Sequence, residues 1–187
     1  MSEKVLDRNA YTIGWICALS VESAAAQAFL DERHQLPSDV SDSNSYVTGR
    51  IGKHNVVVAV MPQNEYRIAT ATTIAKDMVR SFPQVRLGLI VGIGGGGAPS
   101  QEHDIRLGDV VVSSRGKGTG GVIQFDYSKT IQDQDFKETG HLNQPPTALM
   151  TAVAALNAQY DLEGPQLNEK VEDALNNQRK AFKKNLR

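Results

Sequence analysis

Apolar residues along this chain form several short, unbroken or alternating runs that predict β-strands. Continuous apolar stretches of strand length indicate buried strands, and an alternating stretch followed by a Gly-Lys-His turn and a second apolar run indicates a hairpin. The predicted strands span residues 12–19, 46–51, 55–61, a run that starts at 87, 110–113 and 122–127.

Other segments place apolar residues three or four positions apart, or are rich in alanine, and these predict helices. The segment 21–32 is alanine-rich, with Ser20 as the expected N-cap. Helical spacing over 68–81 predicts an amphipathic helix. Two later helices are expected at 147–160 and 167–186, the first opened by a Pro-Pro pair.

The order of these elements predicts an α/β fold in which a mixed β-sheet is flanked by helices. The stretch 34–45 is polar and is expected to be a loop. No predicted strand follows the last two helices, so the chain is expected to be the front part of a larger, here incomplete, unit.

The strand that begins at Leu87 runs directly into the glycines 94–97, a feature typical of a ligand-binding loop. Gly92-x-Gly94-x-x-Gly97 formally matches the dinucleotide-binding fingerprint. That fingerprint requires a helix directly after the glycines, whereas here Ala-Pro-Ser-Gln and a further predicted strand follow. The pattern therefore favours a glycine-lined pocket over a nicotinamide site, with a surface loop as the alternative.

Composition and charge exclude several classes of protein. The 187 residues include 20 Lys and Arg against 21 Asp and Glu, which argues against a nucleic-acid-binding surface. A single cysteine, Cys17, excludes an internal disulfide framework, and its apolar neighbours predict a buried structural thiol. No stretch is long and apolar enough for a membrane helix, and the N-terminus lacks a signal-peptide core. A cytoplasmic protein, with a nuclear one as the alternative, is expected, and neither a cofactor nor a metal is expected.

Three segments, 13–22, 91–99 and 104–113, together resemble the nucleoside phosphorylase/nucleosidase superfamily, in the variant fused to fungal NOD-like and ankyrin-repeat immune receptors. The resemblance covers 11–175 and implies a mixed sheet flanked by helices. It also implies cleavage of the N-glycosidic bond of a nucleoside. Residues 1–10 are then expected to be an N-terminal tail, and 176–187 an atypical helical ending.

The resemblance also implies roles for individual residues. Glu22 matches the family glutamate that orients the attacking water; the alternative is a first-turn glutamate favoured by the helix dipole. Gly94 and Gly95 match loop glycines whose backbone lies against ribose and base. Gly92 and Ile93 belong to the same candidate substrate-binding loop.

Departures from the family pattern bear on the acceptor and on activity itself. Phosphorolytic members carry an arginine and a Ser or Thr where this chain has Ile90 and Ile93, and neither isoleucine can bind phosphate. Hydrolysis is therefore favoured over phosphorolysis. The loop 63–67 is bulky and charged where relatives have small residues, and nothing after Leu175 matches the family's general acid or its ribose-binding Met-Glu pair.

Three hypotheses follow. The first is a purine nucleosidase acting on adenosine or ATP, with a nucleoside or nucleotide as its small-molecule partner. The second is a non-catalytic interaction or signalling module that keeps the fold. The third, a phosphate-dependent phosphorylase, conflicts with the two isoleucines. A sheet cut short leaves an open edge, so a homo-oligomer is also expected.

Overall fold

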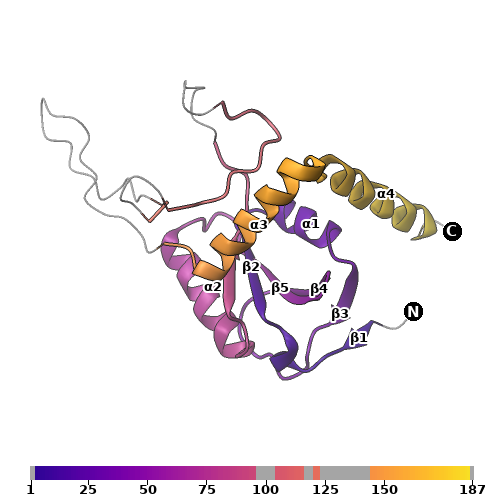
Figure 1. Ribbon diagram of the computed structural model, residues 1–187. Helices are drawn as coiled ribbons and strands as arrows, with labels where there is room; N and C mark the ends of the chain where they lie inside the picture. The colour runs from indigo at the N-terminus through magenta and orange to yellow at the C-terminus, as the bar shows by residue number, and fades with distance from the viewer. Residues whose placement is uncertain (1–2, 96–103, 116–119, 123–143, 186–187) are drawn as a thin grey trace, which may run out of the picture. The chain divides into compact units, whose positions relative to one another are not determined.

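A computed structural model describes residues 3–95, 104–115, 120–122 and 144–185 (Figure 1). The chain divides into two compact units, one formed by Met1–Gly95 and Val171–Arg187 and the other by Gly96–Lys170. The first unit holds the sheet. The remaining helices are α3 (Thr147–Glu163), which lies in the second unit, and α4 (Leu167–Asn185), which begins there and continues into the first.

The described residues of the first unit form a six-stranded mixed sheet in the order β1-β3-β4-β5-β2-β6. Strand β2 lies between β5 and β6 and is parallel to both, whereas β4 is antiparallel to β3 and β5. The α/β class with a mixed sheet is thereby confirmed. The strands are β1 (Lys4–Val5), β2 (Ile13–Cys17), β3 (Glu32–Gln35), β4 (Tyr46–Ile51), β5 (His54–Val60) and β6 (Leu87–Ile90).

Helices α1 (Ser20–Ala28) and α2 (Ile68–Ser81) cover opposite faces of this sheet. Strand β5 is apolar at every position from 56 to 60, and successive side chains point to opposite faces. Its residues Val57 and Ala59 belong to the buried cluster that contains Met78 of α2. The intervening Val56 and Val58 belong to the cluster that contains Ala26 of α1. An unbroken apolar run is thus what a strand buried on both faces requires.

The core on the α2 side is closed by aromatic side chains from distant parts of the chain. Tyr11, which precedes β2, and Phe82, which follows α2, are both fully buried. Their rings meet edge-to-face with centroids 5.4 Å apart, and Tyr46 of β4 meets Phe82 in the same way at 5.3 Å. Such pairs add about 0.5–1.5 kcal/mol beyond the area that they bury. They fix the turn that α2 makes back into β6.

Most predicted elements are found, but several differ in the described residues. The helix predicted over 21–32 ends at Ala28, and residues 4–5 of the expected N-terminal tail form β1. Residues 34–35, expected to be loop, belong to β3, because Arg33 pairs with Gly49 and His34 pairs with Thr48. The predicted strand 110–113 is wrong: this segment is irregular and Val110 and Val111 are 67% and 70% exposed. A run of valines is favourable for a strand only where a partner strand supplies hydrogen bonds and packing. Most of the predicted strand 122–127 lies outside the described residues.

None of the helices in the described ranges has both the length and the apolar character needed to cross a membrane.

Candidate functional site

The candidate site lies where β2, β5 and β6 end. Because these strands are parallel, their carboxyl ends meet at one edge of the sheet, which is where open α/β sheets bind ligands. Three segments leave the sheet there: Ala18 and Leu19 lead into α1, 61–67 lead into α2, and 91–95 follow β6. The catalytic candidate Glu22 follows the first segment, in α1, and the substrate-binding candidates Gly92, Ile93, Gly94 and Gly95 lie on the third.

Glu22 joins the first and third segments through its carboxylate. It is the third residue of α1 and is only 8% exposed. Its Oε2 accepts hydrogen bonds from the backbone N–H groups of Ala18 at 2.8 Å and Leu19 at 2.9 Å. Its Oε1 accepts one from the N–H of Ile93 at 2.8 Å, across 71 positions of sequence. The bond to the N-cap residue is the glutamate half of a capping box.

These hydrogen bonds decide the charge state of Glu22. Burial alone would raise the pKa of its carboxyl group, but the N–H donors of Ile93, Leu19 and Ala18 together bring the pKa below its ordinary value. The carboxylate is therefore ionised at neutral pH. No ion pair to Glu22 is found among the residues that the structure describes, so backbone dipoles, including the N-terminus of α1, compensate its charge.

Gly92 supplies the space in which this carboxylate lies. A Cβ atom built on Gly92 would lie 2.5 Å from Oε1 and 2.8 Å from Cδ of Glu22, closer than real Cβ atoms come. A side chain at this position would push the carboxylate away from the donors that hold it. The glycine is therefore required by a close approach of Glu22 to the backbone.

The rest of the candidate loop is open. The side chain of Ile93 is 75% exposed although its N–H is bonded to Glu22. Gly94 and Gly95 are exposed, and a Cβ at either would meet nothing within 4 Å. The structure thus brings Glu22, Gly92 and the backbone of Ile93 together, and it places Gly94 and Gly95 beside no described group. The remaining glycines, 96–97, lie outside the described residues.

Cys17 lies at the end of β2 near the candidate site but is not suited to nucleophilic chemistry. It is fully buried, and burial, followed by the negative charge of Glu22, raises the pKa of its thiol to about 11. The reactive form of a cysteine is the thiolate, which is scarce at neutral pH with such a pKa. The predicted role as a buried structural thiol is confirmed.

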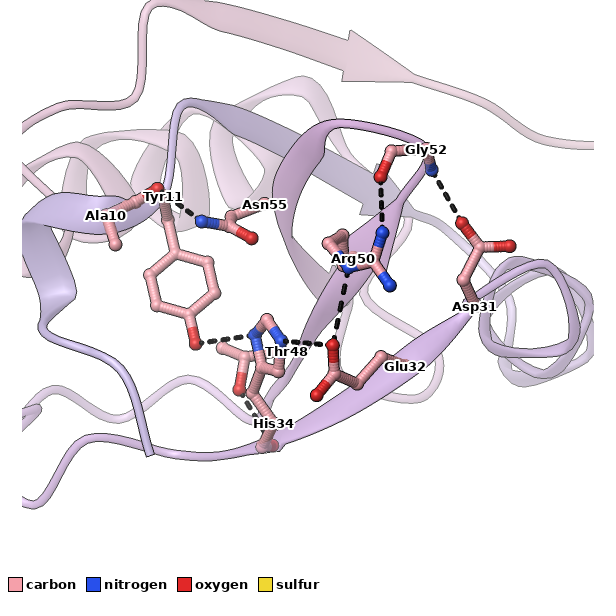
Figure 2. Close-up of polar contacts among 9 residues, drawn as sticks. All are labelled: Ala10, Tyr11, Asp31, Glu32, His34, Thr48, Arg50, Gly52 and Asn55. Atoms are coloured by element: carbon pink, nitrogen blue, oxygen red, sulfur yellow. Dashed lines mark hydrogen bonds and ion pairs between the residues drawn. The ribbon is translucent and has the colours of Figure 1, made fainter. Parts of the chain in front are cut away.

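Figure 2 shows a polar cluster that the sequence did not predict, which we call the His34 cluster: Tyr11, which precedes β2, with Glu32 and His34 of β3 and Thr48 and Arg50 of β4. Tyr11 and His34 are buried, and the Tyr11 hydroxyl lies 3.2 Å from Nδ1 of His34. Nε2 of His34 lies 3.8 Å from Glu32, which also pairs with Arg50 at 3.3 Å. Thr48 donates from its hydroxyl to the backbone carbonyl of His34 at 3.0 Å. No signal for this cluster was present in the sequence, because all four residues of 32–35 are polar and only His34 is buried.

The geometry assigns a neutral imidazole to His34. A proton on Nε2 faces the carboxylate of Glu32 and leaves Nδ1 free to accept from the hydroxyl of Tyr11. Burial lowers the pKa of His34; Glu32 opposes this effect, while Lys4 and Arg50 reinforce it. The ring is enclosed rather than presented to solvent, so the cluster orders the sheet and does not form a catalytic surface.

A second cluster ties the loop 36–45 to the end of α2. The carboxylate of Asp42 accepts hydrogen bonds from the N–H of Asn44 at 2.8 Å, the hydroxyl of Tyr46 at 2.9 Å and the hydroxyl of Ser81. Burial works against the charge of Asp42, but these donors, with Ser81 foremost, lower the pKa of its carboxyl group. The loop is therefore pinned by an ionised side chain.

Within the described ranges, no three or more His, Cys, Asp or Glu side chains gather as they would around a metal ion. The polar groups gathered around Gly92 among the described residues are the Glu22 carboxylate and the backbone N–H groups that it accepts from.

Comparison with known proteins points to one kind of relative. The chain is 46% identical over 168 residues, 88% of its length, to a nucleotide-binding leucine-rich repeat (NLR)-like protein of Hyaloscypha variabilis. The chain spans 16% of the length of that relative. No family model and no solved structure matches the chain. This similarity supports the expected relation to NOD-like receptors, and nothing in these comparisons bears on the nucleoside phosphorylase superfamily.

Proposed function

We propose that this chain is a non-catalytic interaction or signalling module of an NLR-like protein. The observation that carries the proposal is the commitment of the Glu22 carboxylate to three backbone N–H groups. Glu22 is the one residue for which the resemblance implies a catalytic role. In this fold the Glu22 carboxylate joins the start of α1 to the loop after β6 by hydrogen bonds, which is a structural role.

The charge state of Glu22 points the same way. A general base is most effective when its pKa lies near the working pH, so enzymes raise the pKa of catalytic glutamates. Here the backbone donors hold the pKa of Glu22 low instead. Similarity to an NLR-like protein adds to this reading, because a signalling receptor can use a folded module without turnover.

Purine nucleosidase activity is the second candidate, favoured by one specific feature of the same carboxylate. Each carboxylate oxygen has two lone-pair sites. Both sites of Oε2 are used, whereas Oε1 accepts only from Ile93 among the described residues. One acceptor position is thus left beside the glycine loop, and a nucleosidase that uses Glu22 would need such a position to orient its attacking water.

A chromatographic assay separates the two functions. The purified chain is incubated with adenosine and with ATP, each with and without phosphate, and free adenine is measured. We expect no adenine from a sample whose folding has been checked by circular dichroism. Adenine without phosphate would establish the nucleosidase, and release that requires phosphate would establish a phosphorylase.

Variants of two glutamates make the assay specific to the site. Glu22→Gln removes the ionised carboxylate, whereas Glu65→Gln makes the same change on the exposed loop 61–67. If the wild-type chain releases adenine, a nucleosidase that uses Glu22 should lose about 10²–10⁴-fold in rate in the first variant and little in the second. Equal rates in all three proteins would remove Glu22 from the mechanism.

A further inference from the structure

His34 is a titratable side chain inside the fold that the candidate site does not use. It is 5% exposed, and its ring lies between two polar partners (Figure 2). The hydroxyl of Tyr11 lies 3.2 Å from Nδ1, and Oε2 of Glu32 lies 3.8 Å from Nε2. These contacts suit a neutral ring. A second proton would make Nδ1 a donor, so Tyr11 could no longer donate to it.

The charged groups around His34 compensate a second proton poorly. Glu32 supplies negative charge, but its Oε2 also faces Nε of Arg50 on β4 at 3.3 Å. Lys4 of β1 is paired with His34 in the sheet, and paired residues of neighbouring strands project to the same face. Both cations disfavour a positive ring, which adds to the effect of burial on its pKa. Tyr11 faces the ring from the segment before β2 and is neutral, because burial raises the pKa of its hydroxyl.

Strand β1 is the part of the sheet next to His34 that is easiest to open. It is two residues long, both residues are exposed, and Val5 is 60% exposed. On the other side of β3, strand β4 pairs with both β3 and β5, and its Thr48 is 1% exposed. Local opening costs least where few buried contacts are broken. Separation of β1 from β3 would also move the ammonium group of Lys4 away from the ring.

The chain directly after β1 is held by contacts that do not involve His34. Leu6 packs against the apolar cluster on the α2 side. Nε of Arg8 lies 3.2 Å from the carboxylate of Asp39. The side-chain amide of Asn55 donates to the carbonyl of Ala10 at 3.0 Å. An opening that starts at β1 is therefore expected to stop before these contacts.

We propose that His34 is the proton sensor of a local opening, in which β1 separates from β3 when the ring takes up a second proton and the rest of the sheet stays folded. Histidine suits this role because its charge changes close to physiological pH. The inference goes beyond the proposed function and does not rest on it, since it assigns a response to pH to a part of the fold away from the Glu22 carboxylate.

The opening is coupled to one proton, which fixes the direction and size of its pH dependence. With β1 open, His34 meets water and titrates near its ordinary pKa of about 6.5. With β1 in place, the pKa of His34 lies lower. The open form therefore binds the proton first. Between these two pKa values, each fall of one pH unit should raise the equilibrium constant for opening by about tenfold, and above about pH 6.5 it should not change.

Hydrogen exchange followed by NMR tests the proposal on the wild-type chain. Protection of the β1 amides is measured from about pH 7.5 to about pH 5 and corrected for the pH dependence of intrinsic exchange. We expect it to fall by up to about tenfold per pH unit below about pH 6.5. The amides of β2 and β5 should remain far more protected than those of β1 throughout. Constant β1 protection would overturn the proposal, as would equal protection of all three strands at acidic pH, which indicates global unfolding.

Two histidine variants identify the group that takes up the proton. His34→Gln keeps a donor and an acceptor in the ring's place but cannot be protonated, so its β1 protection should not depend on pH. His54→Gln is the matched control, because His54 is exposed at the start of β5, and this variant should respond to pH as the wild type does. A full response in His34→Gln, or its loss in His54→Gln, would assign the response to another group.

The imidazole ¹⁵N shifts of the wild-type chain give the same answer if His34→Gln does not fold. These shifts report the protonation of His34 directly, and the amide shifts of β1 report its pairing with β3. We expect both to change with one midpoint, below about pH 6.5. Protonation of His34 with unchanged β1 shifts, or loss of β1 pairing while His34 stays neutral, would contradict the coupling.

Discussion

At the scale of single residues, the candidate site depends on how the side chain of Glu22 fits beside Gly92, which has no side chain. Glu22 reaches the backbone of the loop after β6 because Gly92 has no Cβ in its path. The ionised carboxylate, the start of α1 and the loop are thus held together by the same few atoms. Hydrogen bonds to a buried charge are among the stronger ones in proteins.

Substituting this glycine should be costly. We expect Gly92→Ala to lower the free energy of unfolding by about 1–3 kcal/mol, because the new methyl group displaces the carboxylate from its donors. Gly94→Ala, where a Cβ meets nothing within 4 Å, should stay within about 0.5 kcal/mol of wild type. Urea unfolding of the three proteins measures both values. Equal stability of the two variants would show that the Glu22 contact is not formed.

The His34 cluster makes stability depend on pH in a definite direction. Burial lowers the pKa of His34 in the fold, while an unfolded histidine titrates at about 6.5. The unfolded state therefore binds the proton first. The stabilising contribution of the neutral ring is fully present above about pH 6.5 and is lost as the pH falls through the lowered pKa.

Urea unfolding between neutral and mildly acidic pH tests this prediction. The wild-type chain should lose stability as the pH falls below about 6.5, and His34→Gln, which cannot titrate, should lose less over the same interval. Carboxyl groups such as Asp42, whose pKa is lowered, act in both proteins and at more acidic pH. Parallel curves for the two proteins would contradict the assignment of a neutral His34.

At the scale of elements, sequence patterns were reliable where a strand or helix has an apolar face of its own. Helix α2 was predicted with the bounds 68–81 that it has, and β5 follows from its apolar run. Strand β3 was missed because only His34 of its four residues is buried, and its structure comes from pairing with β4. The prediction of a strand over 110–113 was wrong for the opposite reason. Its valines are favourable for a strand, but no partner strand pairs with them among the described residues.

The candidate site was predictable to a similar extent. Glu22 and the glycine loop were both singled out by the family resemblance, and the structure brings them together at the carboxyl ends of parallel strands. That Gly92 accommodates the glutamate could not be read from a motif, because this contact depends on coordinates rather than spacing. The roles predicted for Gly94 and Gly95 toward a substrate stay predictions.

Helix α2 should show the contrast between a packed and an exposed face. Met78 is 2% exposed and lies against Gly14 of β2, where an added Cβ would come within 2.5 Å of its sulfur. Met78→Ala should lower the free energy of unfolding by about 2–5 kcal/mol through lost contacts and a cavity. Val79→Ala, at a side chain 51% exposed, should change it by about 0.5 kcal/mol or less. Chemical denaturation measures the free energy of unfolding of both variants. Similar losses would contradict the packing of Met78 against the sheet.

At the scale of the whole molecule, the sheet of the first unit is expected to be most stable against local opening at its central strands. Strands β2 and β5 have hydrogen-bonded neighbours on both sides and side chains in both apolar clusters, whereas β1 has one neighbour and no buried residue. Local opening is cheapest where few buried contacts must be broken. Stability within this unit is therefore expected to fall from the central strands toward the edges.

Hydrogen exchange checks this gradient. The amides of β2 and β5 should exchange slowest, near the rate set by global unfolding, and those of β1 fastest among the strands. Uniform protection across the sheet would contradict the gradient.

The position of β2 in the sheet also affects how the protein folds during its synthesis on the ribosome. Both neighbours of this strand are encoded later: β5 ends at Val60, and β6 begins about 70 residues after β2 ends. At an elongation rate of about 5–20 residues per second, β2 waits roughly 4–14 s for its second neighbour to be translated. During that interval its apolar residues can meet other nascent chains. Slower translation would lengthen this exposure, so the yield of folded protein is set by the order in which strands are made as well as by their final contacts.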